Sequence, residues 1–518
     1  VTTGNLNTIV GGLAGDALTE GNNNVAIGYL ALSAETLGDR NVAIGNSALG
    51  VQNNTSDVDS YNVAVGHTAG AAVTTGIRNV LVGSLAGKAL QTANYNVAIG
   101  YQTLSTDDGG NYNTAIGYKA LEDYEADADG DGHNTAIGSS SQLNATTGEF
   151  NTSLGSLSMG SGVTIGDYNT ALGAEAGKAL TSGASNVFVG GHAGDAITSG
   201  GRNIAMGYAA LSTEDAHGRN TAIGHQALTT QNAGADAYNV AVGYDAGRNV
   251  TTAVQNTLIG GLAGDAITTG GDNVSLGYNS LGSNTIGNEN VAIGKDSMGV
   301  NVAADRNVAV GAFALQNMTS ATTVDTYNTA VGYSAGNAMT SGVNNTIVGG
   351  LAGVAMTTAI QNTALGYFAL STNIDGDNNT AVGFKALQDF EADTDGHGNN
   401  TAIGASAMLN ASTGTENTAL GTLAMGTGVT TGNSNVAIGY QSGHALTSGS
   451  ENITIGQGAG DALTTGNRNV AVGHAALSTE DAHGKNVAIG YLSLLNLDAG
   501  ADGFNTAVGC ESGKTMTT

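Results

Sequence analysis

A pentapeptide that returns along the whole chain constrains the fold more than any other feature. It consists of asparagine, a β-branched residue, a small residue, an aliphatic residue and glycine, as in the run at 24–28, and it occurs twenty-nine times. Successive copies usually lie 17 residues apart, with occasional steps of 18, 19 or 21. A unit this short buries too few residues to fold alone. The repeat therefore predicts a solenoid in which each strand bonds to its equivalent one coil along.

The residue pattern inside each copy predicts a short strand that ends at a glycine turn. The first strand residue is Val, Thr or Ile, the second is usually Ala, and the third is always Ile, Val, Leu or Met. Side chains alternate along a strand, so the first and third residues share one face. The small second residue lies on the other face, where another layer or another chain could approach closely.

The remainder of each coil takes two forms that tend to occur in adjacent pairs, seen at 14–19 and at 31–33. Both end in a polar turn, which predicts a second short strand and a return loop. Invariant glycine and β-branched residues make a helical solenoid the weaker alternative. The predicted fold class is all-β, a repetitive β-solenoid or parallel β-roll with coils of about 17 residues.

The order of short and long steps repeats after 266 residues. The 21-residue step from Asn41 to Asn62 matches the one from Asn307 to Asn328, and the loop at 212–218 returns unchanged at 478–484. No linker or change of composition interrupts the chain. We expect one continuous solenoid over 1–518, with a first super-repeat at 1–266 and a second, incomplete one at 267–518. Repetition without caps favours a piece of a longer fibre.

Composition excludes several classes of function. The chain lacks Pro and Trp, contains 82 Gly, and has only 11% charged residues, unlike an ordinary globular enzyme. A formal charge of −28 would repel nucleic acid, which we exclude as a partner. Cys510 is the single cysteine, so no internal disulfide can form. No apolar run is long enough to predict membrane insertion by this segment.

The asparagine and glycine of the repeat are predicted to be structural. The asparagine could be an exposed turn residue or part of an internal amide ladder; the ladder is favoured because stacking places equivalent amides one strand spacing apart. The glycines are predicted to supply backbone conformations closed to other residues rather than a phosphate cradle. Representative positions are Asn24, Gly28, Asn41, Gly45, Asn113, Gly117, Asn379 and Gly383.

Two long coils carry acidic loops, at 127–132 and 393–398, in which carboxylates alternate with other residues as at the start of a calcium loop. Such oxygen ligands suit Ca²⁺, the one cofactor that the sequence suggests. The candidate ligands are Asp127, Asp129, Asp131, Asp393 and Asp395. No glutamate closes either loop, and His397 replaces the third aspartate of the second, so a solvated acidic turn is the alternative. No zinc spacing or nucleophile elbow is present, which predicts a protein that is not an enzyme.

The runs at 41–45 and 435–439, Asn-Val-Ala-Ile-Gly in both, resemble the head repeats of trimeric autotransporter adhesins. The resemblance covers essentially the whole chain, and similar runs occur in fibres of tailed phages. It implies a left-handed parallel β-roll, three chains associated side by side, and binding to host or matrix surfaces. The coils of that family are shorter than 17 residues, and this segment contains neither its coiled-coil stalk nor its membrane anchor.

These observations favour a structural or adhesive extracellular fibre on a cell surface or virion. Its expected partners are further copies of itself, as a homotrimer or an end-to-end filament, and a host, matrix or cell-surface ligand. A phage tail fibre or tail spike that binds a host surface is one alternative. Another is a solenoid that binds ice or mineral through its threonine turns, although adjacent threonines would point to opposite faces. A glycan-cleaving spike would need an aromatic platform, and aromatic residues make up only 5% of the chain.

Overall fold

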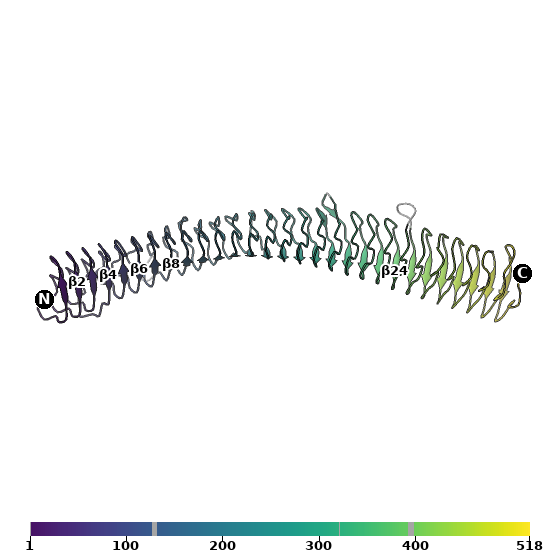
Figure 1. Cartoon of the computed structure of the whole chain (residues 1–518), viewed down its shortest axis with the longest axis horizontal. Helices are drawn as coiled ribbons and strands as arrows, with labels where there is room; N and C mark the ends of the chain where they lie inside the picture. Colours follow the sequence, from purple (N-terminus) through teal and green to yellow (C-terminus); the bar gives the residue numbers. More distant parts are fainter. Residues whose placement is uncertain (1, 127–131, 321, 392–397) are drawn as a thin grey trace. The chain divides into compact units, whose positions relative to one another are not determined.

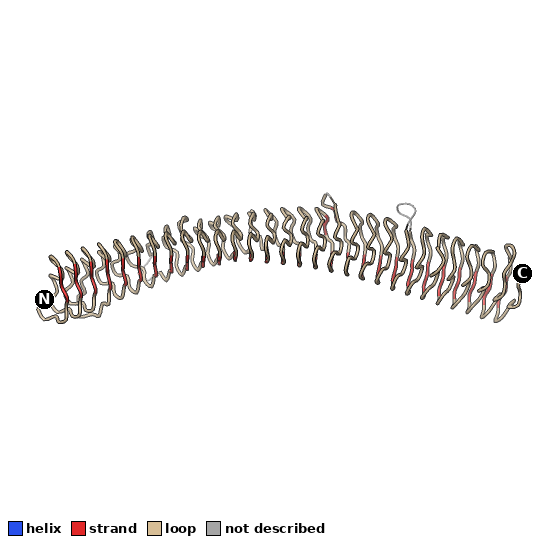
Figure 2. Tube along the Cα trace, in the orientation of Figure 1, coloured by secondary structure: helices blue, strands red, loops and turns tan. Residues whose placement is uncertain are grey.

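The predicted all-β class is confirmed. A computed structural model describes residues 2–126, 132–320, 322–391 and 398–518, which form a parallel β-solenoid with coils of about 17 residues. The chain divides into two compact units, Val1–Gln255 and Asn256–Thr518. Within each unit, the strand of one coil lies beside the strand of the next (Figure 1). No helix occurs in the described residues, and most of each coil is turn or loop (Figure 2).

The strands are three residues long and recur once per coil. In the first unit they are β1 Thr8–Val10, β2 Val25–Ile27, β3 Val42–Ile44, β4 Val63–Val65, β5 Val80–Val82, β6 Val97–Ile99, β7 Thr114–Ile116, β8 Thr135–Ile137, β9 Thr152–Leu154, β10 Thr170–Leu172, β11 Val187–Val189, β12 Ile204–Met206, β13 Thr221–Ile223 and β14 Val240–Val242.

The second unit continues the series and adds one further pair. Its strands are β15 Thr257–Ile259, β16 Val274–Leu276, β17 Val291–Ile293, β18 Ala304–Asp305, β19 Val308–Val310, β20 Val324–Asp325, β21 Thr329–Val331, β22 Thr346–Val348, β23 Thr363–Leu365, β24 Thr380–Val382, β25 Thr401–Ile403, β26 Thr418–Leu420, β27 Val436–Ile438, β28 Ile453–Ile455, β29 Val470–Val472, β30 Val487–Ile489 and β31 Thr506–Val508. The extra pair, β18 and β20, lies in the turns of two neighbouring coils.

Equivalent residues of neighbouring strands lie opposite one another. In the pair β2 and β3, Ala26 lies opposite Ala43, and Ala26 is fully buried between two half-exposed neighbours. The small middle residue therefore faces the opposite wall of its own coil. The other neighbour that the sequence allowed for it, a second chain, cannot reach it, so this residue gives no support to a trimer.

The second half of the coil is not a strand, which corrects that part of the sequence prediction. It is a series of turns whose sixth and eighth residues after the asparagine have left-handed backbones, as at Leu30 (φ 56°) and Leu32 (φ 49°). Left-handed residues interrupt the extended geometry that a strand needs. The turns still bond from coil to coil, with Leu32 N–H donating to Ala48 O at 3.0 Å.

The two forms of coil fill the interior from different positions. In one form the eighth residue after the asparagine is large and the eleventh is polar or small, as with Leu104 and Asp107, both buried. In the other, the eighth is glycine and the eleventh is aliphatic, as with Gly87 and Leu90. A Cβ on Gly87 would lie 2.7 Å from Leu90 Cδ1. Close packing therefore admits one large side chain and not two.

This exchange also explains why glycine coils come in pairs. Two successive glycines leave room for a large residue in the middle of a strand, and Phe188 occupies such a space between Gly177 and Gly194. A Cβ on Gly177 would lie 2.6 Å from the Phe188 ring, and one on Gly194 would lie 2.5 Å from it. A single glycine coil would open only half of that space.

Within the part of the chain that the structure describes, no helix is long and apolar enough to cross a membrane.

Candidate interaction surfaces

The asparagine of the repeat lies inside the coil and bonds along the stack. Oδ1 of Asn24 accepts the N–H of Asn41 at 2.8 Å, and Nδ2 of Asn24 donates to Gly38 O at 2.9 Å. Every step within each unit has the same bond to Oδ1, whereas bonds between two amide groups occur at only some steps. The amide thus replaces main-chain bonds that water cannot supply in the interior.

Four asparagines of longer coils lack the second bond. Their buried Nδ2 atoms have no hydrogen-bond partner among the described residues, because the carbonyl that accepts this bond elsewhere belongs to the turn, which is longer in these coils. They are Asn41, Asn113, Asn220 and Asn379.

The glycine that ends each strand is required by close approach of the next coil. Gly28 has φ +133°, and a Cβ added to it would lie 2.5 Å from Gly45 O. A Cβ on Gly45 would lie 2.3 Å from Gly66 O in turn. Any side chain here would collide with backbone, and so this glycine shapes the coil rather than binding a ligand.

The proposed calcium ligands Asp127, Asp129, Asp131, Asp393 and Asp395 lie outside the described residues, and calcium binding by these loops stays a prediction. Within the described residues, two other groups could bring metal ligands within 4.8 Å of one another. They are Glu214, Asp215 and His217, and Glu480, Asp481 and His483.

Hydrogen bonds to the turn account for the buried carboxylate of the first of these groups. Oε1 of Glu214 accepts the N–H of His217 at 3.1 Å, and Oε2 accepts that of Ala233 at 3.4 Å. Burial raises the pKa of Glu214, while these bonds lower it. Glu214 therefore serves as an internal cap of its turn without a cation.

Asp107 caps a turn in the same way, but less completely. Its Oδ1 accepts the N–H of Gly110 at 2.9 Å, whereas its buried Oδ2 has no partner in the described part of the chain. Burial raises the pKa of Asp107 to about 6 despite the bond from Gly110. At the equivalent position Asn373 makes both bonds, from Gly376 N–H at 3.0 Å and to Gly376 O at 2.9 Å.

We expect Asp107→Asn to stabilise its coil at neutral pH and not in acid. The pKa of Asp107 is about 6 in the folded chain and about 4 when unfolded, so the carboxyl favours folding below about pH 4 and opposes it increasingly up to about pH 6. The variant should raise the free energy of unfolding by roughly 1–3 kcal/mol at pH 7. Hydrogen exchange of peptides spanning 97–112, compared with the parent at each pH, measures this. Asp108→Asn, at an exposed neighbour, is the control, and a gain of equal size in acid would contradict the explanation.

An uncharged aliphatic face follows the strands of each unit. The first and third strand residues point outward and are half-buried or exposed, with Leu154 at 49% and Ile99 at 37%. None of these outward residues is charged in any coil, although the chain carries a formal charge of −28. Monomeric soluble proteins rarely expose contiguous apolar patches above roughly a few hundred Å², so this face is a candidate interface.

Exposed aromatic rings form a row at the residue before the repeat asparagine. Tyr95, Tyr112, His133, Phe150 and Tyr168 stack on five successive coils, with centroids 4.9, 4.9, 4.9 and 5.1 Å apart and ring planes within 12°. Stacking hides the ring faces and leaves the ring edges in solvent. Sequence reasoning missed this row because it counted aromatic residues over the chain; the signal was their fixed place before the asparagine.

The turn threonines bond along the stack. Thr181 Oγ1 donates to Thr198 O at 3.0 Å, and Thr447 Oγ1 donates to Thr464 O at 3.0 Å. A hydroxyl used in this way is turned towards the next coil rather than outward. This geometry does not favour the ice- or mineral-binding alternative.

Comparison with known proteins adds no family to these observations. No protein-family model and no curated protein sequence matches the chain. The fold defines the chain as a repetitive parallel β-solenoid, while its resemblance to autotransporter heads and phage fibres stays a prediction.

Proposed function

We propose that the chain is the shaft of a self-associating structural fibre outside the cell, on a cell surface or virion, and that its aliphatic face is covered by further copies of the chain. The observation that carries this proposal is the absence of charge from the outward strand positions of every coil. A face exposed to water for its own sake would use the acidic residues that the rest of the surface contains. A repetitive solenoid is compatible with such a structural role.

A homotrimer is the assembly that the resemblance suggests, with three strand faces turned towards one another. An adhesive role for the remaining surface, as in a surface adhesin or a phage fibre, is part of the same proposal. Its support is the row of exposed ring edges, since aromatic groups with one wet edge are enriched where proteins bind ligands.

We expect glutamates on the aliphatic face to disperse the assembly. In Ile99→Glu with Ile116→Glu, two charges per chain would be desolvated in the interface, which costs several kcal/mol, so the association constant should fall at least about tenfold. Sedimentation velocity and light scattering give the mass, which we expect to be three chains for the parent.

Gln91→Glu with Thr92→Glu is the matched control, because it adds the same charge at exposed turn positions of the same unit. This control should keep the mass of the parent. A parent chain that sediments as a monomer at micromolar concentration would overturn the proposed self-association.

A further inference from the structure

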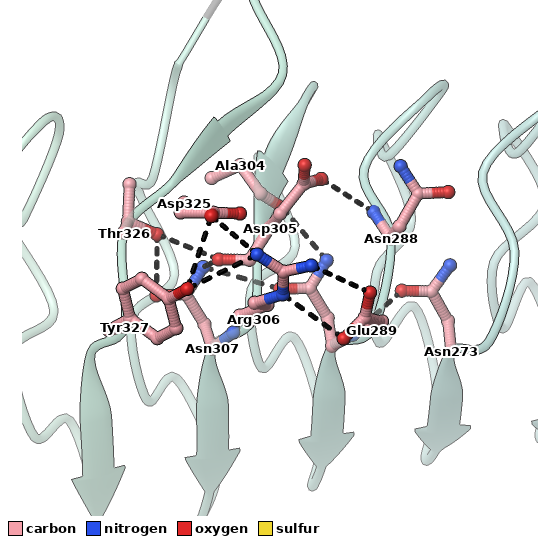
Figure 3. A network of polar contacts seen from close by, with 11 residues as sticks. Asn273, Asn288, Glu289, Ala304, Asp305, Arg306, Asn307, Asp325, Thr326 and Tyr327 are labelled. Atoms are coloured by element: carbon pink, nitrogen blue, oxygen red, sulfur yellow. Dashed lines mark hydrogen bonds and ion pairs between the residues drawn. The ribbon is translucent and has the colours of Figure 1, made fainter.

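Basic side chains in the row before the repeat asparagine are normally paired with residues of the neighbouring coils. Arg306 is the fullest example (Figure 3). Its Nε and Nη2 donate to the carboxylate of Glu289 on one side, each at 3.1 Å, and its Nη1 bonds Asp325 and Tyr327 on the other. The guanidinium is therefore held between an acid one coil back and partners one coil ahead.

Arg202 is the exception in this row. The other basic residues all contact a carboxylate or an aromatic ring in a neighbouring coil: Arg40, Arg78, Arg219, Arg306, Arg468 and Lys485. Arg202 has no ion pair or ring contact in the described part of the chain, and the residue one coil ahead is another cation, Arg219. One coil back lies Ser185, whose hydroxyl has no partner among the described residues either.

The second unit provides the paired counterpart, 266 residues on. There Arg468 donates from Nε to Glu451 Oε2 at 2.7 Å, and Glu451 occupies the place that Ser185 has in the first unit. Lys485 pairs with Asp502 at 2.6 Å, as Arg219 does with Asp236 at 2.7 Å. The two sites thus differ by a single carboxylate.

A second acceptor is missing at the same place. In many coils the residue two places before the asparagine presents a side-chain oxygen to the N–H of its equivalent one coil back. Asp39 Oδ1 accepts from Asn22 at 2.6 Å, and Asn467 Oδ1 accepts from Ser450 at 2.7 Å. Gly201 has no side chain to offer, and neither has Gly218 behind it. The N–H groups of Ala184 and Gly201 consequently have no acceptor among the described residues.

These groups line one surface pocket of about 290 Å³, which includes Ala184, Ser185, Gly201, Arg202, Arg219 and Asp236. The pocket contains two cations and one carboxylate, so its formal charge is +1 in an acidic chain. The equivalent pocket of the second unit, about 240 Å³, contains Arg468, Lys485, Glu451 and Asp502 and is formally neutral.

We propose that the pocket around Arg202 binds the carboxylate group of a ligand. The guanidinium would take the carboxylate in the manner in which Arg468 takes Glu451, and the N–H groups of Ala184 and Gly201 would donate to it as they do to Asp or Asn oxygens elsewhere. Both vacant places are filled by carboxylate or amide oxygens in other coils, which selects a carboxylate over a tetrahedral anion. The site lies away from the strand residues and does not depend on self-association.

The test is ligand-observed saturation-transfer NMR of the full chain with D-glucuronate, a soluble sugar carboxylate. We expect saturable binding that weakens by at least about fivefold in Arg202→Gln. Ser185→Glu should abolish binding, because it places the carboxylate of the second unit beside Arg202. Arg468→Gln is the matched control and should leave binding unchanged. All three positions are exposed, so the fold should persist, as far-ultraviolet circular dichroism would verify.

A gain of binding gives an independent result. In Glu451→Ser with Asn467→Gly, the second unit would acquire the groups of the first, and the number of bound glucuronates should rise from one to two per chain. Acetate should compete with glucuronate, whereas glucose should not. Failure of the parent to bind glucuronate, equal binding by Ser185→Glu, or sulfate competing better than acetate would each overturn the proposal of a carboxylate site.

Discussion

Asn345→Ala should destabilise the second unit by about 2–5 kcal/mol, because it removes a buried amide and leaves main-chain groups without partners. Oδ1 of Asn345 accepts the N–H of Asn362 at 2.9 Å, and its Nδ2 donates to Ala359 O at 2.7 Å. The side chain is almost fully buried, so water cannot replace these bonds without opening the coil. Chemical denaturation, with hydrogen exchange of residues 346–361 as the local measurement, gives the loss.

Asn345→Asp separates the two bonds of this amide. The carboxylate keeps the acceptor but loses the donor, and it places a negative charge against Ala359 O and against Asn328 Oδ1, which Nδ2 contacts at 3.0 Å. We expect a larger loss than for alanine at pH 7, and part of it should be recovered in acid as the carboxyl is protonated.

Asn410→Ala is the matched control for both substitutions. Its amide donates to Thr427 O at 3.0 Å, also between coils, but in an exposed turn. Water can take over that bond, so the loss should stay below about 1 kcal/mol. Equal losses at Asn345 and Asn410 would contradict an internal ladder.

The architecture could be predicted from the period of the sequence alone. Equivalent residues 17 places apart had to stack because no single coil can bury a core, and the observed register of Ala26 against Ala43 is the direct result. The same period placed one aliphatic face outside, since side chains alternate along a strand.

The second half of the coil could not be predicted in the same way. Leucines such as Leu30 and Leu32 are common in strands and helices, and composition gives no sign that their backbones are left-handed here. Such conformations persist only because neighbouring coils hold them, which is a property of the stack and not of the local sequence. The exchange of Gly and Leu between the eighth and eleventh positions is visible in the sequence, but its meaning requires the direction of each side chain.

The candidate carboxylate pocket was hidden for a related reason. Ser185 and Arg202 are unremarkable residues in a polar turn, and only stacking brings them together. The signal was available by comparing the two super-repeats, where Glu451 stands at the place of Ser185. That comparison has physical content only once Arg468 is seen to bond Glu451.

Phe188→Ala should destabilise the first unit by about 3–5 kcal/mol, because it empties the space that two glycine coils reserve for one ring. Phe188 is fully buried, and its ring is the nearest neighbour of both Gly177 and Gly194. Phe188→Leu should lose less, about 1–2 kcal/mol, since Leu81 fills the equivalent space of another glycine pair.

A double-mutant cycle tests whether the ring and the glycine exclude each other. Gly177→Ala alone should destabilise strongly, since its Cβ would lie 2.6 Å from the ring at φ +57°. In the Phe188→Ala background the same change should cost only about 1 kcal/mol for the left-handed backbone. Gly458→Ala is the matched control, because Gly458 has φ +61° and its nearest neighbour is 4.0 Å away. Additive losses of Gly177→Ala and Phe188→Ala, measured by chemical denaturation, would show that the pairing of glycine coils has another cause.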